Sequence, residues 1–226
     1  MILDDEDILI QAAIDSACYK MVDLGLSVKW ANKNVGASHP EDAGLYFQWG
    51  DTIGYTADQV GKDKTFNWES YFDTTDRGDT FNIYNNNGGL TVLLSADDAA
   101  TVHMGSQYRM PTVDEIRELM NNTKQTFIDL NDNGYSKIQA KNGAIKSGKL
   151  KGVRFTGSNG NSIFIPAAGY CADPCMNSIG VSGTLWSSSL SGSYNGCARS
   201  LNFYYDADVY DISDRRNYGA CVRGVE

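Results

Sequence analysis

The sequence contains little of what nucleic-acid binding or membrane insertion would need. Its 226 residues carry 19 Lys and Arg against 28 Asp and Glu, a formal net charge of -9, and basic clusters such as Arg215 and Arg216 are short. Phosphate binding depends on clustered basic side chains, so this charge argues against a nucleic-acid partner. No apolar run approaches the ~20 residues of a membrane-spanning helix, and the opening segment MILDDEDILI lacks the positive region of a signal peptide. We therefore expect a soluble chain without membrane insertion and without an export signal.

Histidine is equally scarce, and the cysteines form no motif. The two histidines, His39 and His103, have no spacing that links them to a nucleophile or to each other as metal ligands. Five cysteines leave one unpaired, and the closest pair, Cys171 and Cys175, lacks the CxxC spacing of a redox or zinc site. Reduced structural thiols are favoured, with a local bridge between Cys171 and Cys175 as the open alternative. The sequence thus predicts no catalytic residue, no metal site and no cofactor.

One segment, DLNDNG at 129–134, imitates the start of a calcium-binding loop. Asp129, Asn131 and Asn133 occupy the first, third and fifth positions, but the twelfth, which should carry a glutamate, is Ala140. An Asn/Asp/Gly turn is the preferred interpretation.

Helical patterns lie in the first half of the chain. Residues 4–19 place apolar side chains at helical spacing behind an acidic first turn. A capping box that begins at Thr112 precedes an apolar stripe and predicts a helix over 113–122. Ser95, followed three residues later by Asp98, resembles an N-cap before an Ala-rich turn.

Strand patterns dominate the second half. Residues 52–90 are polar and rich in Gly, Asn and Asp, and we expect them to form a long surface excursion. Helices early and short strands late predict an α+β fold. Because nothing resembles a linker, we expect a single domain over 1–226. The strand candidates are 22–37 (with turns), 44–51, 152–157, 161–170, 183–190, 198–205 and 219–225.

Residues 202–218, NFYYDADVYDISDRRNY, have a composition that does not suit a protein interior. Most of them are Tyr, Asp, Asn or Ser, while Phe203, Val209 and Ile212 are spaced as buried anchors would be. Tyr gives a large, stiff contact at low entropic cost, and Asn, Ser and Asp supply adaptable hydrogen bonds, as in antibody loops. The pattern favours a recognition surface. The alternative is a sheet face that is rich in Tyr and Asp for solubility alone.

Six phrases in a fixed order carry a family resemblance. They are VDLGLSVKWANKNVGA, EDAGLYFQWGD, LSADDAATVHMGSQYRMPTVDEIRELM, GNSIFIPAAGY, LWSSSL and GACVRGV, spread from Val22 to Val225. Together they resemble the major paralogous domain of Bacteroides- and Fibrobacter-type genomes, and RMPTVDEIREL is similar to a segment of formylglycine-generating-enzyme-like domains. The resemblance implies a C-type lectin-like fold, with terminal strands close together and a loop-rich half that carries the binding face.

Within that group, the C-terminal part resembles the variable proteins of diversity-generating retroelements, in which template adenines are randomised. Single-base changes at the adenines of an Asn codon yield Tyr, Asp, His, Ser, Thr or Ile, and such residues dominate 202–218. The resemblance implies a variable region over about 190–223, in which Cys197 fits as a two-base product. Its constant frame would be Trp186, Ala198, Leu201, Phe203, Gly219, Val222 and Arg223. Its changeable, ligand-binding set would be Tyr194, Asn195, Asn202, Tyr204, Tyr205, Asp206, Asp208, Tyr210, Asp211, Ser213, Asp214, Asn217 and Tyr218.

The resemblance implies a ligand-binding or receptor-binding protein on a phage tail or a bacterial surface, which recognises a protein or glycan on a target cell. The absent signal peptide favours a virion, and the oligomeric state is left open. A non-diversified, adhesin-like module of the same fold is the alternative. An enzyme related to the formylglycine-generating group is a weaker one, because Lys33 stands where many major paralogous domains have Cys, and the paired active-site cysteines of those enzymes are not found.

Overall fold

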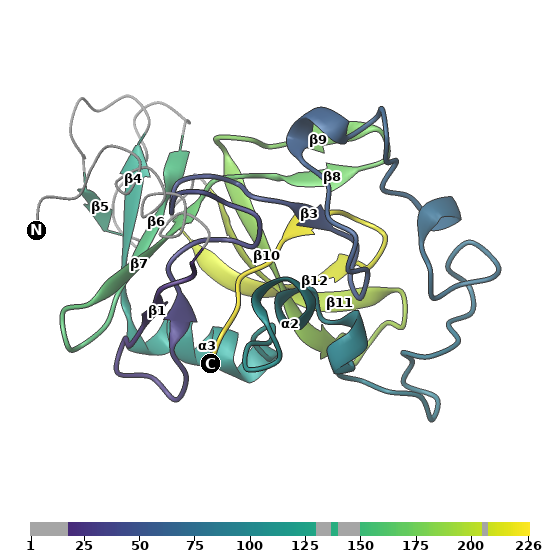
Figure 1. Ribbon diagram of the computed structural model, residues 1–226, viewed down its shortest axis with the longest axis horizontal. Helices are drawn as coiled ribbons and strands as arrows, with labels where there is room; N and C mark the ends of the chain where they lie inside the picture. Colours follow the sequence, from purple (N-terminus) through teal and green to yellow (C-terminus); the bar gives the residue numbers. More distant parts are fainter. Residues whose placement is uncertain (1–17, 130–136, 140–149, 205–207) are drawn as a thin grey trace, which may run out of the picture.

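The computed structural model describes residues 18–129, 137–139, 150–204 and 208–226 (Figure 1). Within these residues the chain forms two α-helices and four sheets of short, mostly antiparallel strands. This arrangement confirms the predicted α+β class. No helix in the described part of the chain is long and apolar enough to cross a membrane.

A five-stranded sheet forms the centre of the molecule (Figure 1). Its strand order is β12-β11-β10-β13-β3, and all neighbours are antiparallel except β10 and β13. Every residue of β10 is buried, so both faces of this strand are covered. The strands predicted at 183–190 and 198–205 are confirmed, whereas no sequence pattern predicts β12. The bounds are β3 Tyr46–Phe47, β10 Ser182–Leu190, β11 Cys197–Tyr204, β12 Val209–Arg215 and β13 Ala220–Cys221.

The larger hydrophobic core lies on one face of this sheet, where helix α3 and a second, four-stranded sheet pack (Figure 1). Leu201 and Phe203 of β11 are buried in it with Ile116 and Leu119 of α3. The ring of Phe127 meets the Phe203 ring edge-on, with centroids 6.4 Å apart. The second sheet has the order β5-β4-β6-β7. The bounds are α3 Val113–Asn122, β4 Lys124–Asp129, β5 Lys137–Gln139, β6 Leu150–Thr156 and β7 Ser162–Pro166.

A second core lies against the opposite face of the five-stranded sheet, at its β3 and β13 end. Trp186 of β10 is buried there with Trp49 and Tyr84. Both indoles satisfy their N–H groups on backbone carbonyls: Trp186 Nε1 donates to Phe47 at 2.8 Å, and Trp49 Nε1 donates to Ser187 at 2.7 Å. Helix α2, Ala99–Met104, covers this core.

Helix α3 begins where the sequence predicts. The Thr112 hydroxyl oxygen accepts from the Glu115 N–H at 3.3 Å, and the Glu115 carboxylate accepts from the Thr112 N–H at 2.7 Å. This reciprocal cap satisfies two N–H groups that a helix start leaves unpaired. The predicted helix over 113–122 is confirmed.

Ser95, by contrast, is not the cap of α2, and that prediction is wrong. Ser95 begins a single 3-10 turn, η3 (Ser95–Asp97), while Asp98 caps α2 by accepting from the Thr101 N–H at 2.9 Å. The same carboxylate accepts from the Met110 N–H at 2.8 Å. The cap is therefore fixed by a contact with a distant part of the chain, which local spacing does not reveal.

The two ends of the described chain lie side by side. Trp30 forms an antiparallel bridge with Val225, as the expected proximity of the terminal strands requires. Arg223 is fully buried beside them and donates to Asn34 Oδ1 at 2.8 Å and to the Phe164 carbonyl at 2.9 Å. Burial lowers the pKa of Arg223 to about 9, and these hydrogen bonds offset the cost of enclosing its charge. The strands at the N-terminal side are β1 Met21–Val22 and β2 Trp30–Ala31.

The predicted surface excursion over 52–90 is anchored by a buried ion pair. Arg216, which follows β12, places its Nη1 3.3 Å from Asp73 Oδ2, and both side chains are fully buried. Asp73 also accepts the backbone N–H groups of residues 82–84, and the Arg216 guanidinium lies 3.7 Å from the centre of the Phe81 ring. The excursion therefore has a packed interior of its own. It contains the short helices η1 Ala57–Gln59 and η2 Trp68–Ser70.

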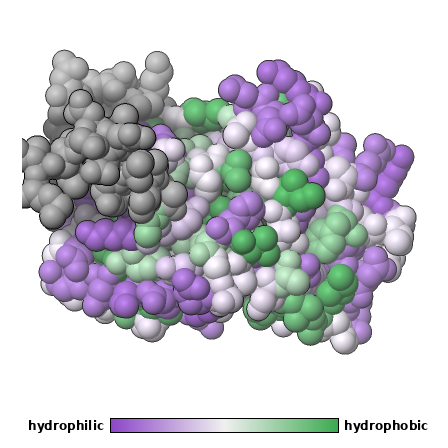
Figure 2. Space-filling model, viewed as in Figure 1, coloured by the Kyte–Doolittle hydropathy of each residue, from purple (hydrophilic) through white to green (hydrophobic). Residues whose placement is uncertain are grey.

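Apolar side chains reach the surface in small separate patches in the view of Figure 2, several of them over the half that contains α2 and the excursion. Ile53, Leu94 and Val102 are at least half exposed. Scattered surface residues of this kind are normal for a globular protein.

The cysteines are unbridged, and all five lie among the described residues. In the hairpin of β8 (Tyr170–Ala172) and β9 (Cys175–Asn177), Cys171 faces Met176 rather than Cys175. Cys171 is buried and Cys175 is exposed, so the local bridge does not form. The predicted helix over 4–19 falls outside the described residues except for Cys18 and Tyr19, as does the calcium-like turn after Asp129.

The buried ion pair predicts a large cost for Asp73→Ala. The change leaves three N–H groups without an acceptor and leaves the enclosed guanidinium with the Tyr84 carbonyl but no counter-charge, and removing one partner of a buried pair costs about 3–5 kcal/mol. The matched control is Glu69→Ala, which breaks the exposed pair with Arg77 and should cost less than about 1 kcal/mol. Urea unfolding measures both changes. Equal, small losses in the two variants would contradict the anchoring role, and Asp73→Asn gives an intermediate loss to measure if Asp73→Ala does not fold.

Candidate ligand-binding face

The pairing register divides the side chains of β11 and β12 between two faces, because successive side chains of a strand point to opposite sides. Leu185, Leu201 and Asp211 stand in one row across β10, β11 and β12. Thr184, Asn202 and Tyr210 form the adjacent row, so they belong to the opposite face. This second side carries what we call the tyrosine face, defined by Asn202, Tyr204, Tyr210, Ile212 and Asp214 of the sheet with Tyr170 and Tyr218 beside them.

The proposed frame residues are all buried, as the sequence predicts for a frame. Leu201 and Phe203 lie in the larger core, whereas Ala198, Trp186 and Val222 lie in the second core. Gly219 and Arg223 are also buried. The larger core therefore lies beneath the tyrosine face, and the second core lies at one end of it.

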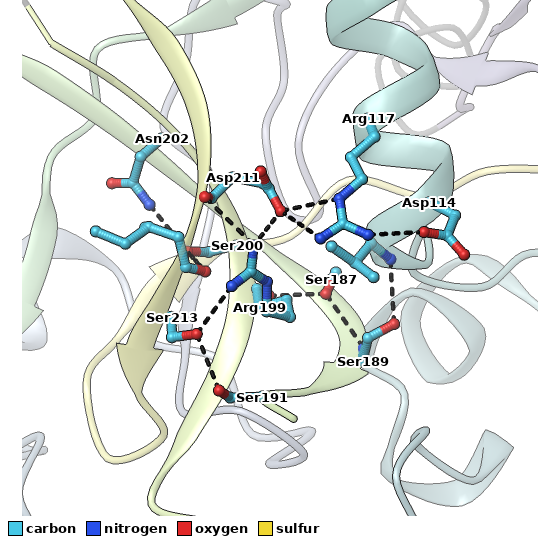
Figure 3. Close-up of polar contacts among 12 residues, drawn as sticks. Asp114, Arg117, Ser187, Ser189, Ser191, Arg199, Ser200, Asn202, Asp211 and Ser213 are labelled. Carbon is cyan, nitrogen blue, oxygen red and sulfur yellow. Dashed lines mark hydrogen bonds and ion pairs between the residues drawn. The ribbon is translucent and has the colours of Figure 1, made fainter. Parts of the chain in front are cut away.

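Hydrogen bonds fix the polar centre of the tyrosine face. The Asn202 Oδ1 atom accepts from the Thr184 hydroxyl at 2.9 Å, and Asn202 Nδ2 donates to Asp214 Oδ2 at 2.9 Å. The Ser200 hydroxyl donates to the same Asp214 oxygen at 2.6 Å. Figure 3 shows Ser200 and Asn202 next to each other on β11. A partner would meet a fixed carboxylate rather than a mobile one.

Tyrosine rings surround this polar centre. Tyr210 is 38 % exposed, and Tyr204 is half-buried on the same side of the sheet. The rings of Tyr170 and Tyr218 pack with centroids 5.7 Å apart. Burial, and then the nearby Tyr218, Asp214 and Tyr204, raise the pKa of Tyr170. The Tyr170 hydroxyl therefore stays protonated and can donate as well as accept.

The sequence does not identify two members of this surface, nor the buried Thr184 next to it. Tyr170 comes from the β8–β9 hairpin, and only its position at the end of a predicted strand gave a signal. Ile212 is 39 % exposed, so its assignment as a buried anchor is wrong. Val209 lies on the inner side of β12, and successive side chains of a strand point to opposite sides. Ile212 comes three positions later, so it faces outward. Thr184 lies on the strand that runs beside Asn202.

Asp211 and Ser213 belong to the side of the sheet opposite the tyrosine face, where both side chains are half-buried. The Asp211 carboxylate binds Arg199 of β11 and lies 3.0 Å from Arg117 of α3 (Figure 3). Burial acts to raise the pKa of Asp211, but the two arginines together hold it below the ordinary value. Ser213 accepts from Arg199 at 3.0 Å and donates to Ser191 at 2.9 Å. These contacts fasten α3 to the sheet.

Four further predicted residues are described by the structure, and none of them belongs to the tyrosine face as defined above. Tyr194, which is 68 % exposed, and Asn195 lie in the turn between β10 and β11. Asn217 is only 5 % exposed, and its backbone carbonyl accepts from Gln48. Asp208 is exposed just before β12. Tyr205 and Asp206 lie outside the described residues.

The thiols and carboxylates offer little for catalysis. Burial raises the pKa of Cys221 to about 12 and also raises that of Cys171, whereas a nucleophilic cysteine needs a lowered pKa. Cys197 at the start of β11 has a pKa raised by burial too. No group of His, Cys, Asp or Glu among the described residues is arranged to hold a metal ion.

Comparisons with known proteins give no match for this chain: no family model, no curated protein and no solved structure matches it. Its function is therefore inferred from the geometry of the chain itself.

The register predicts opposite outcomes for two neighbouring aromatic residues. Phe203→Ala should lower the free energy of unfolding by about 3 kcal/mol, because the ring is fully buried between two sheets. Tyr210→Ala, on the other side of the sheet, should change it by less than about 1 kcal/mol. Chemical denaturation of both variants measures the difference. The reverse ranking would show that the sheet faces the other way.

Proposed function

We propose that this chain is a ligand-binding protein of the C-type lectin-like kind, and that its tyrosine face recognises a protein or glycan on a target cell. The observation that carries the proposal is the division of β11 and β12. Leu201 and Phe203 are sealed in the core, while Asn202, Tyr204 and Tyr210 stand on the outer side of the same strands. Tyrosines that serve only solubility need no such fixed arrangement with Asp214 and Asn202.

The overall layout supports the lectin-like part of the proposal. Strand β2 pairs with the C-terminal segment at Trp30 and Val225, one capped helix crosses beneath the sheet, and a long excursion over 52–90 packs at one end (Figure 1). Such an arrangement keeps a rigid frame beneath a surface that tolerates many side chains.

The energetics of tyrosine favour contact with a macromolecule. Tyr brings a large area and a polar hydroxyl with few rotatable bonds, so little entropy is lost when it is fixed in an interface. Tyr170 and Tyr218 already pack on each other, which lowers that loss further. Asp214 and Asn202 supply directional hydrogen bonds between the rings.

Diversification by a retroelement is the second part of the proposal, with display on a phage tail or a bacterial surface. It is supported by the identity of Asn202, Tyr204, Tyr210 and Asp214, each of which is Asn or a one-base product of an Asn codon. Asp211, Ser213 and Asn217 have structural contacts instead, so the changeable set is smaller than the sequence suggests. We infer binding without catalysis, and a non-diversified adhesin-like module is the alternative.

The binding role predicts that Tyr204→Ala combined with Tyr210→Ala weakens recognition while the fold is kept. Labelled protein is applied to an array of purified bacterial surface proteins and glycans, and affinity for any bound feature is then measured. The double variant should bind about tenfold or more weakly. Tyr108→Ala, which removes a ring from the segment after α2 rather than from this face, is the matched control and should bind like the parent. Equal binding by the double variant and the parent would overturn the assignment of this face.

The diversification role predicts a signature in the gene. A template repeat near the gene should differ from the codons for about residues 190–220 only at adenines, and a reverse transcriptase should lie beside it. Sequencing the locus tests this. Differences at other bases, or no repeat, favour the non-diversified module and leave the binding test unaffected.

A further inference from the structure

A hollow separate from the tyrosine face lies where the turn between β10 and β11 meets the excursion over 52–90. Its volume is about 430 Å³, within the roughly 300–1,000 Å³ typical of ligand sites. It is lined by Trp68, Arg77, Gly78, Asp79, Phe81, Tyr194, Asn195, Gly196, Cys197 and Arg215. Cys197 and Arg215 face each other in the sheet on the side that also carries Arg199 and Ser213, so the hollow does not share its lining with the tyrosine face.

The wall of the hollow is a packed structure rather than a loose loop. The Trp68 and Phe81 rings lie 5.7 Å apart, and the buried Arg216 guanidinium stacks on Phe81 from the inside. Gly78 has φ +99°, and a side chain there would meet the Trp68 ring at 2.7 Å. Glycine at this position therefore lets the backbone approach the ring closely, which holds the indole in place.

Aromatic rings and arginine side chains converge on this hollow. Trp68 is half-buried, Phe81 is buried and Tyr194 is 68 % exposed, so the three rings offer apolar surface at different depths. Arg215 is exposed and forms no ion pair with any described residue, whereas Arg77 is held by Glu69 at 2.8 Å. In a chain of net charge -9, Arg215 is therefore the arginine of this lining that has no ion pair with a described residue and can meet an anion.

Further hydrogen-bonding groups complete the lining. Asn195 accepts from the Asn86 N–H at 2.7 Å through its Oδ1 atom, which leaves the amide Nδ2 group to donate. Asp79 is exposed and supplies an acceptor. Burial raises the pKa of Cys197, so its thiol adds no charge.

We propose that this hollow binds an acidic sugar residue, with the carboxylate on Arg215 and the apolar ring face on Trp68 and Tyr194. The guanidinium fork matches a carboxylate in two parallel hydrogen bonds. The Asp79 carboxylate and the Asn195 amide pair with sugar hydroxyls, which need an acceptor and a donor at the same time. A simple inorganic anion would use the arginine but none of the aromatic surface. The site is additional to the tyrosine face and does not depend on its proposed role.

Tryptophan fluorescence gives a direct readout of this site. Trp30, Trp49 and Trp186 are fully buried, and Trp68 alone among the four tryptophans is partly exposed. A ligand that covers Trp68 should therefore change the emission of that residue. The probe is trigalacturonic acid, and its fully methyl-esterified form is the control, because esterification removes the charge and keeps the rings.

The proposal predicts a saturable emission change with trigalacturonic acid and binding about tenfold or more weaker for the ester. Arg215→Ala should weaken binding of the acid to a similar extent, and Arg215→Lys should restore part of it. Lys124→Ala, which removes one exposed positive charge elsewhere, should change binding less than about twofold. The Tyr204→Ala and Tyr210→Ala double variant should bind the acid normally, which separates this site from the tyrosine face.

Four results would overturn the proposal, and the first three concern the sugar acid itself. They are no emission change at millimolar acid, equal binding of acid and ester, and an affinity that Arg215→Ala leaves intact. Inorganic phosphate that competes as well as the sugar acid shows an anion site without sugar recognition, which also contradicts the proposal.

Discussion

The enclosed contact between Arg216 and Asp73 is the interaction on which the rest of the architecture depends. Enclosing two charges costs several kcal/mol of desolvation, and here that cost is offset by three backbone N–H groups that Asp73 accepts and by aromatic rings around the guanidinium. The contact joins the residue after β12 to a segment more than a hundred positions earlier. Because of this contact, the polar, Gly-rich excursion packs against the second core. The contact also holds in place the side of the hollow that Trp68 and Phe81 form.

The two faces of the five-stranded sheet differ in how strongly their side chains are tied to the rest of the fold. On one side, Arg117, Arg199 and Asp211 connect α3 to β11 and β12 (Figure 3), so those positions are committed to the fold. On the other side, Tyr204, Tyr210 and Ile212 contribute little to either core. This asymmetry lets the outer side vary while the strands keep their register. It also explains why residues of the same chemical type, Asp211 and Asp214, have different roles three positions apart.

Local chemistry could be predicted from the sequence, and long-range contacts could not. The capping box at Thr112 and the strands near 183–190 and 198–205 depend on neighbouring residues, so patterns revealed them. Strand β12 was missed because Val209 and Ile212 stand three positions apart, which breaks the strict alternation of apolar and polar residues that predicts a strand. The structure puts half-buried Val209 and exposed Ile212 on opposite faces. The sequence predicts that Asp211, Ser213 and Asn217 face outward, because composition does not show which face of a strand a side chain occupies. The role of Asp98 and the burial of Arg216 depend on partners far along the chain.

The central claim is that a fixed frame supports an interchangeable outer face. It is tested most directly by displaying two libraries of this chain on phage and measuring the folded fraction by protease resistance. One library randomises Asn202, Tyr204, Tyr210 and Asp214, and the other randomises Ala198, Leu201, Phe203 and Val222. The account predicts that most members of the first library stay protease-resistant and that most members of the second do not. Similar folded fractions in the two libraries would contradict it.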